Sequence, residues 1–464
     1  MSEQAKFLEG SLFRHIAVMS FTAAAGLMAI FLVDFVDMIF ISMLGKEELA
    51  AAIGYAGAIL FFTSSFGIGC SIAAGALVAR ALGAGDEDGA RQKATTSLIW
   101  GVLFGSVFAA LVWVNIPALT SFLGAEGSTQ ALANSYLRII IPSLPLLLVG
   151  MVGGAILRAF GDARRSMMAT LAGGAVNAIL DPILIFGLDL ELTGAALASV
   201  AARFTIGAVA LIPIFTHHGG LDRPKIAPML QDFRPLAVIA LPAILTQLAT
   251  PIGQAYVTRS MAEFGAEAVA GMAIVARLTP VSFGIIFALS GAIGPIIGQN
   301  AGAGQHSRVR DTFREGMMFA ALLIVSISAV LFVLRGPIAD LFQAEGVTRQ
   351  LVFLFCGPLA LAFFFNAVIF VGNASFNNLG HPFYSTWINW GRHTVGTVPF
   401  VIAGAAIMGA PGVLIGQAAG GAIFAVITIV LARRVMTNAE AADAGARAPF
   451  QREARQHSLL NHRR

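Results

Sequence analysis

Acidic and amide side chains interrupt two otherwise apolar stretches of this 464-residue sequence. Asp34 and Asp37 lie three residues apart, and Asn177 and Asp181 lie four apart, so each pair shares one face of a helix. An ionised side chain at the centre of a bilayer costs about 2.5–3.5 kcal/mol or more and usually faces a cavity or a partner. Carboxylate and amide oxygens are hard ligands for small cations, and carboxylates also bind protons. The pattern predicts a proton or cation site.

A structural reading of the same residues stays open at this point. The carboxylates could cap helices or pair with buried arginines such as Arg203. Asp34 is the most ambiguous, because it could share a proton with Asp37, contact a substrate, or only accept hydrogen bonds. Pro182 follows Asp181 directly and removes a backbone donor, which weakens the helix at the site.

Composition indicates that membrane-spanning helices position these side chains. Hydrophobic residues make up 57% of the chain, charged residues 12%, and mean hydropathy is +0.81. A span needs about 20 mostly apolar residues, and closed barrels would show short alternating strands, which are absent here. We therefore expect an all-α polytopic membrane protein with twelve transmembrane helices. They fall near 14–43, 49–79, 94–115, 131–157, 165–188, 193–215, 235–258, 268–299, 313–334, 350–377, 383–406 and 411–432.

The two halves of the chain resemble each other. Gly83-Ala84-Gly85 reappears as Gly302-Ala303-Gly304, an offset of 219 residues, and similar glycine markers recur at offsets of 218–220. Six spans in each half predict two lobes related by a pseudo-twofold axis along the membrane normal, as in many transporters. The expected domains are a cytoplasmic N-terminus (1–13), an N-lobe (14–215), an inter-lobe loop (216–234), a C-lobe (235–433) and a basic tail (434–464).

Lys and Arg residues predict the orientation in the membrane. The loops after spans 2, 4, 6 and 8 and both termini carry most of them, whereas the opposite loops hold only Lys46, Arg259, Arg335 and Arg349. We expect both termini to be cytoplasmic in a multi-pass protein of a bacterial inner (plasma) membrane. The basic cluster at 308–314 is explained by this topology, so no nucleic-acid partner is expected.

Several motifs resemble those of multidrug and toxic compound extrusion (MATE) transporters. Residues 37–45 (DMIFISMLG) resemble the first-helix signature of that family, and residues 177–182 (NAILDP) with 194–199 (GAALAS) are similar to its fifth- and sixth-helix signature. Gly83-Ala84-Gly85 and residues 299–303 (QNAGA) resemble the ends of its helices 2 and 8. The resemblance covers about residues 10–435, in order.

The resemblance implies a coupling site in the N-lobe. Asp37, Asn177, Asp181 and Ser199 stand at the family's proton or cation positions, with a serine where a threonine is common. One branch of the family also has carboxylates in helices 7 and 10, where this chain has Thr250 and Asn366. Coupling is then expected in the N-lobe alone, as in the branch resembling DNA-damage-inducible protein F.

The implied function is secondary active efflux of organic compounds, cationic and amphiphilic ones in the first place, in exchange for protons or sodium ions. A flippase for lipid-linked saccharides is the alternative, although its basic cavity contrasts with the acidic residues here. Metalloprotease, hydrolase, phosphate-loop and dinucleotide motifs are absent, so neither an enzyme nor an ATP-driven pump is expected. We expect a monomer that needs no cofactor beyond an ion gradient.

Three further features have plain structural interpretations. Cys70 and Cys356 lie in apolar runs and are interpreted as small packing residues rather than as a disulfide. Arg277 is interpreted as a structural charge, with a substrate contact as the alternative. The spacing of Gly416 and Gly420 is typical of helices that pack closely.

Overall fold

The computed structural model consists of helices and loops throughout the backbone it describes, residues 5–461. Within that range the side chains are described except those of Asp34, Ser42, Glu47 and residues 442–461. The predicted all-α membrane fold is confirmed.

The first half of the chain contains the helices of six spans. They are α1 (Leu12–Met43), α2 (Glu47–Gly83), α3 (Glu87–Val114), α4 (Ile116–Phe122), α5 (Gly127–Ile140), the 3-10 turn η1 (Ile141–Ser143), α6 (Leu144–Ala159), α7 (Ala163–Pro182), the π-helical turn η2 (Ile183–Gly187) and α8 (Glu191–His217). The fourth span runs from α5 through η1 into α6. Prolines 142 and 145 remove backbone donors at that point, which explains the 3-10 turn inside the span.

The second half repeats this order. Its helices are α9 (Ile226–Ala262), α10 (Ala266–Gly302), α11 (His306–Leu341), α12 (Gly346–Leu354), the π-helical turn η3 (Phe355–Leu359), α13 (Ala360–Asn378), α14 (Pro382–His393), α15 (Val398–Met408) and α16 (Ala410–Asn461). Helix α9 begins at Ile226, inside the segment predicted as the inter-lobe loop. The segment predicted as a basic tail continues α16 as a helix as far as Asn461.

Eleven helical segments within the described residues are long and apolar enough to cross a membrane. The predicted span near 383–406 is divided into α14 and α15, which is why it does not count as one continuous helix. Helix α16 lies directly against this break, because a Cβ at Gly420 would overlap the carbonyl oxygen of Gly396 and one at Gly416 would overlap that of Phe400. The close packing predicted for Gly416 and Gly420 is therefore confirmed.

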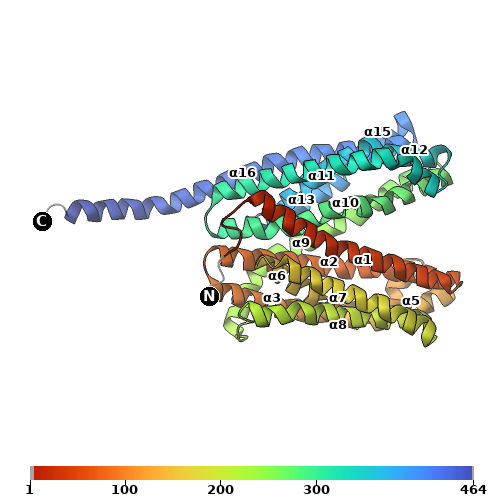
Figure 1. Cartoon of the computed structure of the whole chain (residues 1–464), viewed down its shortest axis with the longest axis horizontal. Coiled ribbons are helices and arrows are strands. Elements are labelled where there is room, and N and C mark those ends of the chain that lie inside the picture. The colour runs from red at the N-terminus through yellow and green to blue at the C-terminus, as the bar shows by residue number, and fades with distance from the viewer. Residues whose placement is uncertain (1–4, 462–464) are drawn as a thin grey trace.

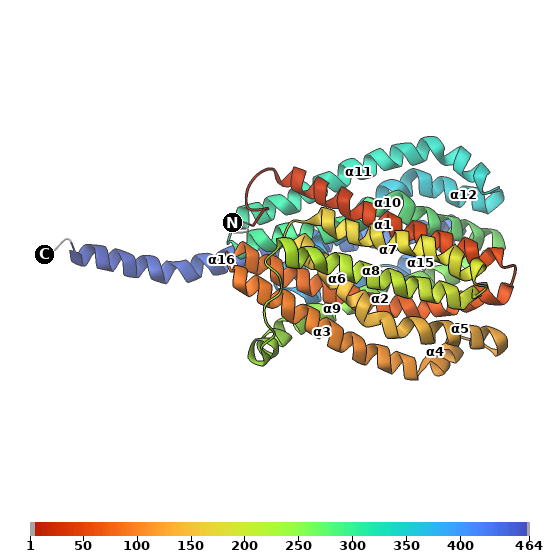
Figure 2. The ribbon, with the colours of Figure 1, turned by 60° about the horizontal axis from the view of Figure 1, so that its bottom comes forward.

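The two halves form two groups of helices side by side (Figure 1). Helices α9 and α10 begin the second half as α1 and α2 begin the first. The two halves meet where the first helix of each packs on the second helix of the other: α1 on α10, and α9 on α2. Viewed after a 60° turn, α3, α4 and α5 lie along one side of the bundle, and α11 and α12 lie along the other (Figure 2). The chain leaves the bundle through α16 at the end where its N-terminal segment lies.

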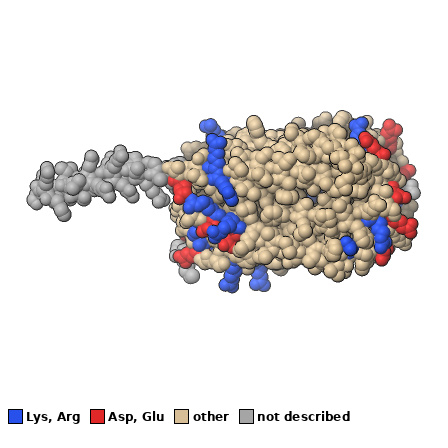
Figure 3. Space-filling model, turned by 90° about the horizontal axis from the view of Figure 1, so that it is seen from above, with Lys and Arg blue, Asp and Glu red and all other residues tan. Residues whose placement is uncertain are grey.

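Charged residues gather at the two ends of the molecule, and a broad belt between them carries none on the face shown in Figure 3. Large apolar side chains are exposed within the predicted spans, among them Leu111 at 60%, Phe204 at 63% and Val325 at 59%. Exposed apolar surface on this scale fits contact with lipid, and charged ends fit contact with water. The chain is a multi-pass membrane protein.

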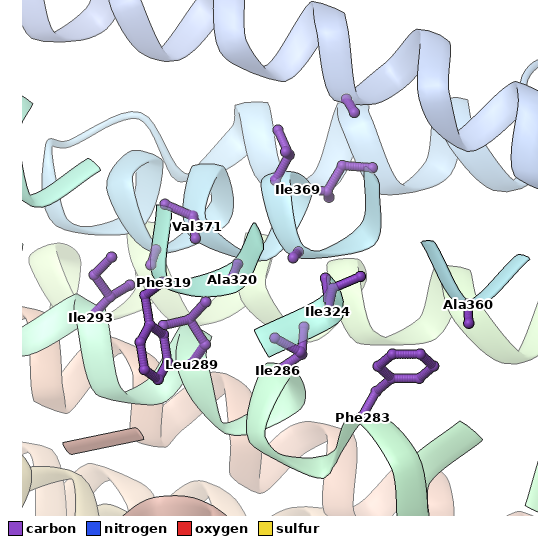
Figure 4. Packing of buried hydrophobic residues seen from close by; sticks show 14 of the residues in the cluster. Phe283, Ile286, Leu289, Ile293, Phe319, Ala320, Ile324, Ala360, Ile369 and Val371 are labelled. Atoms are coloured by element: carbon purple, nitrogen blue, oxygen red, sulfur yellow. The ribbon is translucent and has the colours of Figure 1, made fainter. Parts of the chain in front are cut away.

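The interior of the second half is packed by aliphatic and aromatic side chains of α10, α11 and α13 (Figure 4). Phe283 is fully buried and stacks on Phe363 with ring centroids 4.1 Å apart. Its backbone (φ −110°, ψ 19°) departs from helical geometry and kinks α10. Because lipid is as apolar as these side chains, close packing rather than water exclusion stabilises this core.

Candidate ion-coupling site

Helix α7 is the central element of the site and packs against both α1 and α8. Asp162 caps its first turn by accepting a 3.3 Å hydrogen bond from the backbone N–H of Arg165. The Asp162 carboxylate also lies 3.1 Å from Nε2 of His218, just after α8. Burial alone would raise the pKa of Asp162, but the hydrogen bonds from Arg165 and His218 hold that pKa below its usual range. The N-terminus of α7 is thus tied to the end of α8.

Asn177 and Asp181 face the same way one turn apart on α7, as predicted. Nδ2 of Asn177 donates a 2.6 Å hydrogen bond to Oδ2 of Asp181. Asp181 is completely buried, and its Oδ1 has no hydrogen-bond partner among the described side chains. Directly after it, Pro182 ends the α-helical pattern and the π-turn η2 begins. The carboxylate therefore sits where the helix changes geometry, a common feature of functional sites.

Asp37 of α1 meets Asp181 of α7, which brings two predicted residues from different spans together. The two carboxyl groups lie within hydrogen-bonding reach of each other. Oδ1 of Asp37 is buried and has no hydrogen-bond partner in the described part of the chain. Two carboxylates this close repel when both are charged, so a shared proton or a cation between them relieves the contact. The pair is chemically suited to exchange one for the other.

Ser199 and Tyr136 complete the surroundings of the pair. The hydroxyl groups of Ser199 on α8 and Tyr136 on α5 lie within hydrogen-bonding reach, and Tyr136 is close enough to Asp37 and Asp181 for their charges to act on it. Ser199 was predicted from its position in the motif. Tyr136 was not predicted, because a single tyrosine in an apolar span carries no distinctive spacing; its hydroxyl inside that span was the available signal.

Arg203 does not neutralise the carboxylates. Its Nη1 donates to the carbonyl oxygen of Ile140 at 3.0 Å and to the hydroxyl of Ser143 at 2.9 Å, at the 3-10 turn of the fourth span. None of the described side chains forms an ion pair with Asp37 or Asp181. The alternative that these acids pair with a buried arginine is therefore not supported, and Arg203 instead serves the carbonyl groups that the η1 turn leaves free.

Asp34 is placed only by its backbone, three residues before Asp37 on α1. Its side chain lies outside the described side chains, and its role stays a prediction.

Glycines allow the two halves to touch closely near the N-terminal segment. A Cβ at Gly83, at the end of α2, would overlap the carbonyl oxygen of Gln299, and one at Gly302, at the end of α10, would overlap that of Arg80. The Gln299 side chain accepts from the backbone N–H of Phe7 at 2.9 Å and donates to the carbonyl oxygen of Ala159 at 2.8 Å. At the repeated glycine motifs, the backbone of one half therefore lies directly against the backbone of the other, and this contact closes one end of the bundle.

A buried carboxylate adds a second connection between the halves at the start of α9. Asp232 is 5% exposed and accepts hydrogen bonds from Lys93 at 2.9 Å, Gln92 at 3.0 Å and Thr96 at 3.1 Å, all on α3. Trp100 of α3 donates to the carbonyl oxygen of Met229 at 2.9 Å. These bonds hold the first turns of α3 and α9 together.

The second half has no carboxylate at the two positions considered from the sequence. Thr250 is exposed on α9, and Asn366 on α13 accepts a 2.5 Å hydrogen bond from Nη1 of Arg392. Arg277 is exposed on α10, so it is not a structural charge enclosed within its lobe, and a substrate contact stays the alternative. Cys70 and Cys356 are both buried and free, in agreement with packing roles.

Comparison with known families finds two matches within this chain. The sequence model of the MatE family matches residues 23–183 and again residues 242–402. The two matches are displaced by 219 residues, the offset seen for the Gly-Ala-Gly motif. The internal repeat is thereby supported independently of the glycine pattern.

Individual relatives are similar over most of their length. The FAD transporter of Shewanella oneidensis is 28% identical over 94% of this chain and 97% of its own. The multidrug export protein MepA of Staphylococcus haemolyticus is 26% identical over 73% and 75% of the two chains. The crystal structure of the Vibrio cholerae MATE transporter VcmN superposes with a TM-score of 0.87 at 24% identity, covering 92% of this chain and 97% of that one, which establishes the fold.

Proposed function

Because this chain belongs to the MatE family, whose members are ion-coupled antiporters of small organic substrates, we propose that it exports organic compounds in exchange for protons or sodium ions. The observation that carries this proposal is the contact between Asp37 and Asp181, two carboxyl groups from different spans. Family membership also argues against the lipid-linked saccharide flippase and against an enzyme.

Coupling takes place in the N-lobe. A proton or sodium ion binds between Asp37 and Asp181, and Asn177 holds one carboxylate in place through its 2.6 Å bond. Loading and unloading this pair changes the charge between α1 and α7 and so biases how these helices pack. Thr250 and Asn366 supply no acid in the C-lobe, which supports placement in the branch resembling DNA-damage-inducible protein F.

Transport follows alternating access of the two lobes. The contacts of Gly83 and Gly302 and the bonds of Asp232 close the end that carries the termini. With both termini cytoplasmic in a bacterial inner membrane, this is the conformation closed to the cytoplasm. Export requires these contacts to separate so that substrate can enter from the cytoplasm. Both lobes belong to one chain, so a monomer is sufficient for this cycle.

Cationic, amphiphilic compounds are the first proposed substrates. The acidic N-lobe favours them, and MepA of Staphylococcus haemolyticus, with which this chain shares 26% identity, is a multidrug exporter by name. Flavin nucleotides are the second candidate. The relative aligned over 94% of this chain transports FAD by name, so a phosphate-bearing substrate deserves a direct test.

The decisive experiment is transport by purified protein in liposomes. A fluorescent cationic dye and FAD would each be followed under an imposed proton gradient, an imposed sodium gradient, or neither. Movement of either compound that requires one of the gradients supports the proposal and identifies the ion. Equal movement without a gradient would indicate a passive channel instead.

A further inference from the structure

Arg392, at the end of α14, is a buried cation without a carboxylate. It is 8% exposed, and none of the ion pairs among the described residues includes it. Its two hydrogen bonds go to neutral acceptors: Nη1 donates to Oδ1 of Asn366 at 2.5 Å, and Nη2 donates to Nε2 of His393 at 2.7 Å. A guanidinium has five N–H donors, so three remain, and the buried Nε–H has no acceptor in the described structure.

The contact with His393 fixes the state of that imidazole. Arginine can only donate, so Nε2 of His393 must accept, and the ring is neutral with its proton on Nδ1. Nδ1 is buried and also lacks an acceptor among the described groups. Gly253 of α9 makes room for this ring, since a Cβ there would overlap Nδ1. The cluster thus holds one positive charge and two buried donors without an acceptor in the described structure, Nε–H of Arg392 and Nδ1–H of His393.

The buried positive charge of Arg392 has no described acidic side chain beside it, and a bound anion would compensate it. An arginine inside a spanning segment is costly and is normally paired, and a buried donor without an acceptor adds about 1–3 kcal/mol. Asn366 and His393 orient the guanidinium but leave its charge uncompensated. Thr394, which follows His393, and Thr250, three residues before Gly253, are both exposed, so the cluster lies beside the protein surface.

The internal repeat gives this cluster a counterpart in the N-lobe. A displacement of 219 residues relates Gly253 on α9 to Asp34 on α1, and Arg392 on α14 to Gly173 on α7. Gly173 lies one turn before Asn177 and two turns before Asp181. Helix α7 carries Asp181 in the first half, whereas its counterpart α14 carries Arg392 about two turns before the position equivalent to Asp181.

We propose that Arg392, oriented by Asn366 and His393, binds a phosphate group of a transported substrate. The planar guanidinium suits bidentate contacts with phosphate oxygens, and three of its donors are available. The inference rests on the proposed export function and concerns the second candidate substrate class named there, phosphate-bearing compounds, with the acid pair in the N-lobe left for the coupling ion.

The test compares riboflavin, FMN and FAD, which share one ring system but differ in phosphate. Flavin binding to the purified full-length protein would be measured by fluorescence anisotropy. We expect FMN and FAD to bind about 10- to 100-fold more tightly than riboflavin, the range expected for hydrogen bonds to a charged group, and inorganic pyrophosphate to compete with FAD. Equal affinity of all three flavins, or no binding of FMN and FAD, overturns the proposal without any variant.

Variants then assign the preference to Arg392. Arg392→Gln is expected to bind FAD no better than riboflavin, and Arg392→Lys to retain part of the preference. Arg164→Gln, which removes an exposed arginine at the start of α7, serves as the matched control and keeps the full preference. A folded Arg392→Gln protein that still prefers FAD contradicts the assignment. Gradient-driven efflux of a cationic dye by the parent would show that the export function stands even if the phosphate site does not.

Discussion

Asn177 donates a 2.6 Å hydrogen bond to Oδ2 of Asp181, and the same carboxyl group meets Asp37 across the boundary between α7 and α1. The amide holds one oxygen of Asp181, while Oδ1 of each aspartate has no hydrogen-bond partner among the described residues. Each of the two helices thus presents to the other a carboxylate oxygen that has no hydrogen-bond partner among the described groups.

Replacing Asp37 or Asp181 by Asn is expected to reduce gradient-driven efflux to the level of cells lacking the protein. Each substitution keeps the shape of the side chain but removes the exchangeable charge. Dye efflux would be compared at equal surface expression, with Asp88→Asn as the control because the Asp88 side chain is 89% exposed at the start of α3. Parental efflux by both variants would refute N-lobe coupling.

Thr250→Ala is expected to export like the parent. Thr250 is exposed on α9, and its replacement should change stability by less than about 0.5 kcal/mol. Asn366→Ala is expected to be less benign than the sequence indicates, since it removes the acceptor of Arg392. Transport and thermal stability of the two variants would be measured together. Loss of ion coupling in Thr250→Ala would indicate that the C-lobe takes part in coupling.

Gly83→Ala and Gly302→Ala are expected to weaken closure of the end that carries the termini. Each new methyl group would overlap a carbonyl oxygen of the opposite half, so the lobes must separate there. The readout is labelling of a cysteine introduced between the lobes by an impermeant maleimide from either side. Gly291→Ala is the control, because a Cβ at that position of α10 meets nothing within 4 Å. Identical labelling of all three variants would show that this contact does not control access.

Asp34→Asn tests whether Asp34 titrates together with Asp37. The two lie one turn apart on the same face of α1, so a shared proton would link their charges. We expect transport to survive with a shifted or flattened pH profile. An unchanged profile would mean that Asp34 only accepts hydrogen bonds, a role that asparagine also fills.

Asp162→Ala is expected to destabilise the protein in a pH-dependent way. Loss of the helix cap should cost about 0.5–2 kcal/mol near neutral pH. Because the pKa of Asp162 is lower in the folded state, its stabilising effect is present above its unfolded pKa of about 4 and is lost as the pH falls through the folded value. Melting temperatures of parent and variant in detergent should therefore converge in acid. A constant difference at every pH would argue against this assignment.

Spacing in the sequence was sufficient to single out Asp37, Asn177 and Asp181, because ionisable groups in apolar spans are rare; the structure places them together, and their role in coupling stays a prediction. The repeat was equally visible, since glycines mark backbone contacts that recur in both halves. Tyr136 escaped prediction because its role depends on which helices meet, which a linear pattern does not contain. The break after His393 lies against α16, and Arg392 bonds to Asn366, which is 26 positions away. Contacts between segments this far apart leave no pattern in the sequence. The helical continuation of α16 had a signal in its alanine-rich composition.

The proposed coupling pair lies in a single lobe, which would limit the work available per transport cycle. Asp37 and Asp181 can release at most two protons between them. One elementary charge crossing 100 mV supplies about 2.3 kcal/mol, and about 1.4 kcal/mol corresponds to a tenfold concentration ratio. A stoichiometry of one charge per cycle would therefore sustain about 50-fold accumulation of an uncharged solute at that voltage, and two charges about 2500-fold. Measuring the steepest gradient that the protein can maintain would count the ions exchanged without observing them directly.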